Sequence, residues 1–135
     1  MKLVLSALVG ATSSILGEAP VLAERDGLSP AQTLEMIVES TVASPLIGDK
    51  QDMIGRMDFS PAFSVVQMMK DFTLITEAGR KKQVPMFLAN LILQRYAAAS
   101  NVGYSEQNFS ALFDWMRVTY GLAGTPCLTG AHRKT

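Results

Sequence analysis

Lys70 and Asp71 are adjacent residues of opposite charge within the mostly apolar stretch FSVVQMMKDFTLITEAG, residues 63–79 of the 135-residue chain. Helical spacing places Lys70 on an apolar face with three other side chains, those of Phe63, Val66 and Leu74. Burying an unpaired ammonium costs several kcal/mol. Lys70 therefore extends to water, pairs with a carboxylate, or faces a site that an anion fills.

A second pattern begins at the N-terminus, where Lys2 heads a narrow helical face of small side chains: Ser6, Gly10, Ser13 and Gly17. Small residues leave a groove through which a ligand can approach the helix, and they equally let two helices pack closely. Helix packing is the simpler interpretation. We expect the opposite, apolar stripe of this helix to face the core, through Val4, Leu8, Ala11, Ile15, Ala19 and Leu22.

The composition limits the classes of function. Hydrophobic residues make up 48% and charged residues 18%, which is typical of one folded domain with a single core. Lys plus Arg and Asp plus Glu each total 12, so no net charge favours nucleic acid. A single cysteine, Cys127, and a single histidine, His132, leave no intrachain disulfide and no Cys/His metal site.

The elements that must position these residues all read as helices. We expect a long first helix over residues 2–25 with a kink at Pro20, ended by Gly27 in a left-handed turn. Ser29 and Gln32 predict a capping box for a second helix, and Ser60 followed by Pro61 predicts the start of the helix that carries Lys70. Val65, Met68, Met69, Phe72, Ile75 and Gly79 predict its core stripe.

The other segments complete an all-α fold. Residues 44–58 read as an irregular connection with at most one short helix, and helices are expected after Pro85 and over residues 106–120. Residues 125–135 are expected to be a loose tail. Strand alternation of useful length is absent, so the sequence predicts a single all-α domain over residues 1–124.

The N-terminal stretch MKLVLSALVGA also resembles the start of a secretory leader. The amphipathic pattern continues past the expected cleavage region, which favours a helix of the mature protein. Serines, Thr12 and Glu18 interrupt the apolar residues before the ~18 that a membrane span needs. We therefore expect a cytoplasmic protein that does not bind a membrane, and a small secreted helical protein is the alternative.

Collinear segments over nearly the whole chain resemble one family. They are Lys2, GEA at 17–19, AERDGLSP at 23–30, the stretch from residue 59 to 79, VP at 84–85 and LQRYAAASNVGYSEQNFSALF at 93–113. In order and spacing they resemble the C-terminal domain of the 3-hydroxyisobutyrate dehydrogenases, which are β-hydroxyacid dehydrogenases. The resemblance implies a helical domain with a long first helix, like that of 6-phosphogluconate dehydrogenases. Such a domain follows an N-terminal Rossmann domain, pairs subunits and closes the active-site cleft.

The resemblance also implies roles for individual residues. Lys2 corresponds to the catalytic lysine, which transfers a proton at the substrate hydroxyl, and Lys70 to a lysine that reaches the bound NAD or NADP. Phe63 and Asp71 would support the site as an apolar wall and a balancing charge. Ser6 stands where the family usually has a substrate-binding asparagine, and serine offers one donor where an amide offers two. No metal is implied.

The cofactor platform itself is not in this sequence, since no G-x-G-x-x-G motif occurs in it. The implied partners are a Rossmann domain of the parent enzyme, a second subunit and a small hydroxy acid, which is oxidised, or whose semialdehyde is reduced. We expect the chain alone to be inactive. The alternative is a non-catalytic helical assembly module left after loss of the Rossmann half.

Overall fold

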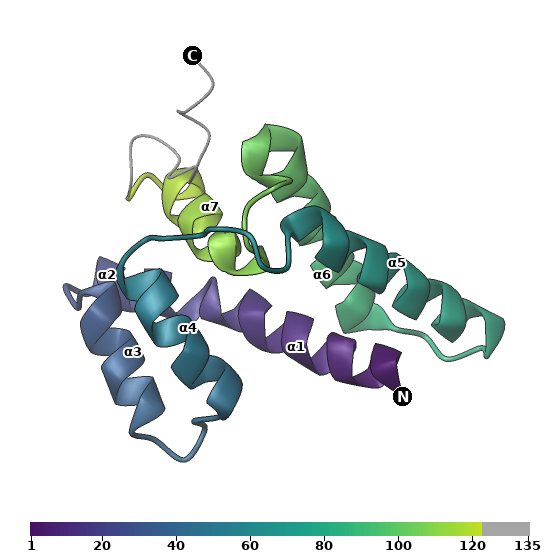
Figure 1. Ribbon diagram of the computed structural model, residues 1–135, viewed down its shortest axis with the longest axis horizontal. Coiled ribbons are helices and arrows are strands. Elements are labelled where there is room, and N and C mark those ends of the chain that lie inside the picture. Colours follow the sequence, from purple (N-terminus) through teal and green to yellow (C-terminus); the bar gives the residue numbers. More distant parts are fainter. Residues whose placement is uncertain (123–135) are drawn as a thin grey trace.

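The computed structural model describes residues 1–122, in which all regular structure is helical (Figure 1). The α-helices are α1 (Lys2–Leu16), α2 (Ala19–Arg25), α3 (Pro30–Val38), α4 (Pro45–Gly55), α5 (Val65–Lys81), α6 (Phe87–Ala99) and α7 (Leu112–Thr119). A π-helical turn, η1 (Ser100–Tyr104), and a 3₁₀ turn, η2 (Phe109–Ala111), join α6 to α7. Within the described residues no strand forms beyond an isolated bridge between Ser64 and Asn108. The all-α prediction is confirmed there, and the predicted tail at 125–135 lies outside this part of the chain.

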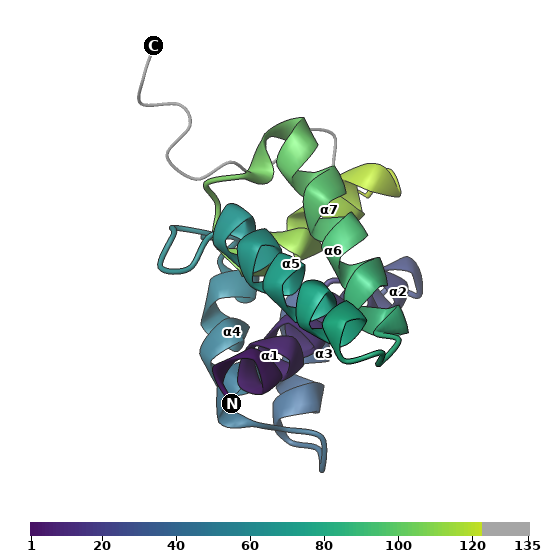
Figure 2. The same cartoon turned by 90° about the vertical axis from the view of Figure 1, so that its right-hand side faces the viewer.

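Helix α1 connects the two parts of the fold. It packs against α5 and α6, which lie side by side, while α3 and α4 pair with each other at the other end of the molecule (Figures 1 and 2). Helix α7 packs against α1 and α2, and η2 contacts α1, α4 and α5. The start of α1 is therefore next to α5, and its end is next to the α2–α7 region.

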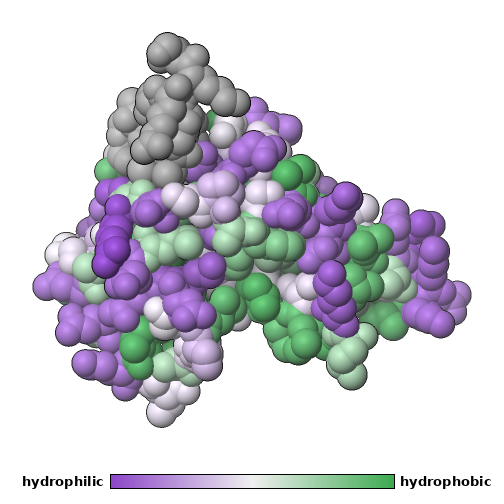
Figure 3. Space-filling model, in the orientation of Figure 1, coloured by the Kyte–Doolittle hydropathy of each residue, from purple (hydrophilic) through white to green (hydrophobic). Residues whose placement is uncertain are grey.

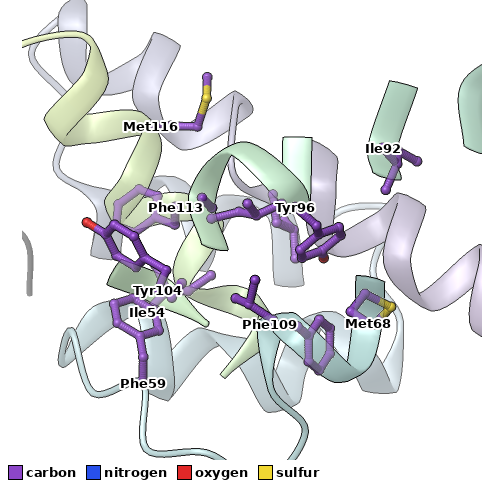
Figure 4. Close-up of a cluster of buried hydrophobic side chains, with 14 of the residues drawn as sticks. Ile54, Phe59, Met68, Ile92, Tyr96, Tyr104, Phe109, Phe113 and Met116 are labelled. Carbon is purple, nitrogen blue, oxygen red and sulfur yellow. The ribbon is translucent and has the colours of Figure 1, made fainter. Parts of the chain in front are cut away.

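Buried apolar side chains from most of these helices form one core (Figure 4). Its largest fully buried side chains include Tyr96, Tyr104, Phe59, Phe72 and Phe113. The stripe predicted for α5 is confirmed, because Val65, Met68, Phe72, Ile75 and Gly79 are all buried and Met69 is partly buried. The methionines of α5 are thus explained by core packing.

Helix starts follow capping chemistry, with one prediction confirmed and one wrong. Ser29 and Gln32 form the predicted capping box of α3. Helix α5 begins at Val65, capped by Ser64 and Gln67, and not after Ser60. The Ser60 hydroxyl donates instead to Asp58, at 2.6 Å, a hydrogen bond that lowers the pKa of that carboxyl.

The chain between Ser60 and α5 is not helical, because its backbone pairs with a distant segment. The Phe109 amide donates to the carbonyl of Phe63 at 2.9 Å, and the Asn108 amide donates to that of Phe59, also at 2.9 Å. The Val65 amide donates to the carbonyl of Gln107 at 2.8 Å. These bonds satisfy backbone groups that a helix would otherwise use, so α5 starts later than predicted.

The prediction of an irregular connection over residues 44–58 is wrong in part, because this segment contains the eleven-residue helix α4. The hydroxyl of Ser44 accepts a hydrogen bond from the amide of Ile47, and Pro45 occupies the first helical position. Ile47 and Ile54 are buried against the rest of the fold. Tertiary packing therefore outweighs the two glycines, which lowered the helix propensity of this segment.

The predicted orientation of α1 is wrong. Val4, Leu8, Ile15 and Leu22 are 59%, 63%, 55% and 70% exposed. The small-residue face is buried instead, at Gly10, Ser13, Ser14 and Gly17. The cause is close packing, because a Cβ atom added at Gly10 would lie 2.2 Å from the ring of Phe72. The small residues admit a bulky neighbour that no leucine face could admit.

The N-terminal helix also breaks earlier than predicted. Helix α1 ends at Leu16, and α2 starts at Ala19 with Pro20 in its first turn, where proline is tolerated. The turn at Gly17 and Glu18 replaces the kink expected at Pro20. Gly27 adopts φ of +94°, as predicted for a left-handed turn.

One helical stretch of the described residues, 2–25, is long and apolar enough to cross a membrane by length and composition. This corrects the expectation that polar residues interrupt the apolar run too often, since the stretch has 24 residues and a mean hydropathy of 1.4 in its most apolar window. The core helix of a soluble protein meets the same criterion, and this stretch packs on α5, α6 and α7 in the fold.

Candidate active site

Lys2 is the first residue of α1, and its side chain is exposed. Ser6, one helical turn later on the same face, is partly buried. The third residue of this row, Gly10, contacts Phe72 of α5. The row headed by Lys2 therefore runs from open solvent at the helix start into the α1–α5 contact.

Asp71 lies at the edge of that same contact. It immediately precedes Phe72, whose ring meets Gly10, and it is partly exposed. Its carboxylate is in no ion pair within residues 1–122. Two predicted site residues, Lys70 and Asp71, lie on α5. Of these, Asp71 lies nearer to the side of α5 that packs on α1, the helix carrying Lys2 and Ser6.

Lys70 lies on the outer face of α5. It is two residues from buried Phe72, which is about 200° around an α-helix, and it is exposed. Its neighbours Val66 and Leu74 are also exposed, at 42% and 49%, so the apolar face around Lys70 is open to solvent. Lys70 makes no ion pair in the part of the chain described, so the carboxylate pairing is not seen there, and its exposure is compatible with the other two possibilities.

The described residues do not bring Lys2 and Lys70 into contact. They stand on two adjacent helices, on the start of α1 and the outer side of α5, and both are exposed. Neither amine is buried in an internal ion pair of the described fold. Their catalytic and cofactor-binding roles, like the roles of Ser6, Phe63 and Asp71, stay predictions.

Phe63 precedes α5 and is partly buried. Its ring packs edge-on with Phe109, with ring centroids 6.0 Å apart and an interplanar angle of 83°. The backbones of the same two residues are joined by the amide-to-carbonyl bond already described. Phe63 is therefore held by η2 through both its backbone and its ring.

One residue near Phe63 was not predicted from the sequence to belong to the site. Lys50 on α4 is buried, with 8% of its surface exposed, and its Nζ lies 4.1 Å from the centroid of the Phe109 ring. Burial lowers the pKa of Lys50, and the nearby carboxylate of Asp49 acts in the opposite direction. The signal was its spacing, because Ile47, Lys50 and Ile54 fall on one face of α4.

A groove lies elsewhere on the surface, between α1 and α6, with a volume of about 440 Å³. Its walls include Ile15, Leu88 and Leu91, and Arg95 pairs with Glu18 at 3.2 Å and with the Ser14 hydroxyl. Figure 3 shows apolar surface gathered over the underside of the molecule. Residues 1–122 contain no cluster of acidic, histidine or cysteine side chains that could hold a metal ion, while Cys127 and His132 lie outside them.

The described residues form an all-helical domain in which the first helix, α1, packs against α5 and α6. Residues 1–116 match the family described as the NAD-binding domain of NADP-dependent 3-hydroxyisobutyrate dehydrogenase. The chain belongs to this family, whose members are NAD(P)-dependent dehydrogenases.

Individual relatives agree with this assignment. Over 114 residues the chain is 25% identical to glyoxylate/succinic semialdehyde reductase 1 of Arabidopsis thaliana, covering 84% of this chain and 39% of that protein. Over 121 residues it is 29% identical to 2-(hydroxymethyl)glutarate dehydrogenase of Eubacterium barkeri, covering 88% and 40%. The crystal structure of 3-hydroxyisobutyrate dehydrogenase from Salmonella typhimurium superposes with a TM-score of 0.77 at 25% identity, covering 83% and 39%. The chain thus spans about two fifths of the length of these relatives.

Proposed function

We propose that this chain is the helical part of an NAD(P)-dependent β-hydroxyacid dehydrogenase and works with a Rossmann domain. The observation that carries the proposal is the family match over residues 1–116, with Lys2 exposed at the head of α1. The substrate would be a small 3-hydroxy acid or the corresponding semialdehyde. Oxidation of a 3-hydroxy acid agrees with the name of the bacterial relative, 2-(hydroxymethyl)glutarate dehydrogenase, whose hydroxyl is β to a carboxyl. The plant relative is named for glyoxylate and succinic semialdehyde, which correspond to a 2-hydroxy and a 4-hydroxy acid.

Lys2 would act on the hydroxyl of the substrate. Its ammonium can stabilise the alkoxide that develops as the substrate is oxidised, and its amine can exchange the hydroxyl proton. Exposure at a helix start suits this role, because the side chain can reach into a cleft formed with a second domain. Ser6, one turn further, would donate to or accept from a polar group of the substrate.

NAD or NADP, when bound, would supply the acceptor for the hydride. The residues of this chain fit only one end of such a cofactor. Lys70 offers a cation between the exposed apolar side chains of Val66 and Leu74, which suits a nicotinamide and a nearby phosphate. The glycine-rich turn that seats a pyrophosphate is not found in the sequence, so the second domain must hold most of the cofactor.

A second candidate function is that of a non-catalytic assembly module. The exposed apolar residues of α1, α2 and α6 favour it, because they include Leu8, Ile15, Leu22, Leu88 and Leu91. Such a surface suits contact with another protein, for instance a second subunit in a homodimer. The same surface would also serve a dimeric dehydrogenase, so the two candidates differ in whether Lys2 performs chemistry.

The test is to join the chain behind the Rossmann domain of a β-hydroxyacid dehydrogenase of this family and to measure NAD(P)H formation with a series of 3-hydroxy acids. Lys2→Ala should lower turnover about 10²–10⁴-fold, the usual contribution of a general acid–base group. Its melting temperature should not change, because Lys2 is exposed at a helix end. The matched control is Lys81→Ala, which removes an exposed ammonium from the last turn of α5.

Two outcomes would contradict the catalytic proposal. One is full activity of the Lys2→Ala fusion. The other is a well-folded fusion that binds NAD(P)H through its Rossmann domain and oxidises none of the 3-hydroxy acids. With the second outcome, a dimer of the chain in solution would support the assembly module.

A further inference from the structure

We infer that Lys50 is a positioning residue, whose ammonium holds the ring of Phe109 and thereby fixes Phe63 at the edge of the cleft. The inference rests on the proposed function for the role of Phe63 as a cleft wall. It concerns a residue on α4, which carries none of the side chains assigned to the site so far.

The geometry forms a chain of two contacts from α4 to Phe63. Nζ of Lys50 lies 4.1 Å from the centroid of Phe109, within the range of a cation–π contact. Phe109 in turn packs edge-on with Phe63, at 6.0 Å between centroids. Phe109 is 5% exposed and belongs to the buried cluster in Figure 4, so its ring has little room to move independently.

The backbone of the same segments adds rigidity to one side of this arrangement. The Phe109 amide donates to Phe63, and Asn108 and Ser64 form the isolated β-bridge. Those bonds fix the main chain, while the orientation of the Phe63 ring depends on what packs beside it. Lys50 reaches Phe109 from a different helix, and α4 and η2 are in contact. The main chain of Phe109 is therefore held by backbone pairing with Phe63, and its ring is contacted by a cation from α4.

A purely structural role accounts poorly for the choice of lysine. Within residues 1–122 the Lys50 ammonium makes no ion pair, although the residue is buried, and burial of an unpaired cation opposes folding. A leucine would fill the same space between Ile47 and Ile54 without that penalty. A cation on an aromatic face is directional, whereas a leucine contact is not. The buried lysine thus lowers stability, and in return its cation fixes the orientation of the Phe109 ring.

The first test uses the 135-residue chain and side-chain NMR. Wild type should show cross-relaxation between the Phe63 and Phe109 rings, and Lys50→Leu should weaken it and speed the ring flips of Phe63. Lys50→Arg keeps the cation and should restore the wild-type pattern. Lys81→Leu, which removes an exposed ammonium, should have no effect. If Lys50→Leu does not fold, Lys50→Gln replaces it.

The second test uses the Rossmann fusion. Lys50→Leu should raise the KM for NAD(P) about five-fold or more while kcat changes less than about two-fold, because positioning of a binding wall affects binding in the ground and transition states alike. Lys50→Arg should recover most of the loss, and the melting temperature of Lys50→Leu should be unchanged or higher. In a Phe63→Ala background, Lys50→Leu should have no further effect, as expected for two residues that act in series.

The inference is overturned by an unchanged KM in Lys50→Leu, by effects that add in the Phe63→Ala background, or by an unchanged ring pattern in the NMR experiment. Failure of the proposed function is a separate outcome. It would show as a wild-type fusion without activity or cofactor affinity, and the NMR experiment would then decide alone whether Lys50 holds the two rings.

Discussion

Phe72 of α5 packs so closely on Gly10 of α1 that its ring leaves no room for a side chain at position 10. A Cβ atom at Gly10 would lie 2.2 Å from Cε2 and 2.5 Å from Cζ of the Phe72 ring. Phe72 is fully buried, so its ring cannot turn aside at low cost. This contact sets how close α1 lies to α5, and with it the placement of Lys2 and Ser6 relative to Asp71.

Gly10→Ala should therefore destabilise the protein, although alanine is the better helix former. We expect a loss of about 1–3 kcal/mol in the free energy of unfolding, the usual cost of overpacking a core. The measurement is chemical denaturation followed by circular dichroism. Gly48→Ala is the control, since nothing lies within 4 Å of an added Cβ there, and it should stabilise by about 0.5–1 kcal/mol. Equal effects of the two substitutions would contradict the packing argument.

Glu24→Gln should weaken the connection between α2 and α7. Both carboxylate oxygens of Glu24 accept from the Arg117 guanidinium at 2.9 Å, and each side chain is only 19% exposed. Loss of this charged pair should cost about 1–3 kcal/mol of unfolding free energy. The control is Asp52→Asn, whose partner Arg56 lies 3.9 Å away on the surface, and which should change stability by less than about 0.5 kcal/mol. Comparable losses for both would contradict the prediction.

Lys50 should make stability rise with pH in the alkaline range. Because burial lowers its pKa in the folded state, the unfolded chain binds more protons between the folded pKa and the ordinary pKa of lysine. Its unfavourable contribution is thus fully present below the folded-state pKa and is relieved as the pH rises through that interval. Lys50→Leu should be at least as stable as wild type at neutral pH, and this difference should shrink towards alkaline pH. Denaturation of both proteins from about pH 7 to about pH 10.5 measures it, and a constant difference would reject it.

Lys70→Ala should weaken cofactor affinity in the Rossmann fusion. If Lys70 contacts a cofactor phosphate as proposed, its removal should raise the dissociation constant of NAD(P)H by about ten-fold, which corresponds to ~1.4 kcal/mol. Its stability should not change, since Lys70 is exposed. Fluorescence titration with NADH and NADPH measures the affinity, with Lys81→Ala as the control. An affinity equal to that of wild type would remove Lys70 from the site.

Local chemistry made the helices of this fold predictable. The capping box of Ser29 and Gln32, the buried stripe of α5 and the left-handed Gly27 each depend on residues close in sequence. The predicted site residues likewise came from matching segments in order, which requires no knowledge of packing. The structure places these residues on α1, before α5 and on α5, and leaves Lys2 and Lys70 exposed.

The errors share a different cause, because they depend on contacts between distant segments. The start of α5 was wrong because residues 59–65 pair with residues 107–109. Helix α4 is longer than the short helix allowed for this segment, because Ile47 and Ile54 are buried in a core that the local sequence does not reveal. The orientation of α1 was wrong because apolar periodicity alone does not show which face meets the rest of the protein.

The inverted orientation of α1 has a consequence for how the protein tolerates variation. In a saturation library screened for folded protein, hydropathy would point to Leu8 and Ile15 as the sensitive positions, yet these side chains are more than half exposed. The intolerant sites should be the glycine and serines on the opposite side. Polar replacements at Leu8 and Ile15 should pass such a screen, because neither side chain contributes to the buried core.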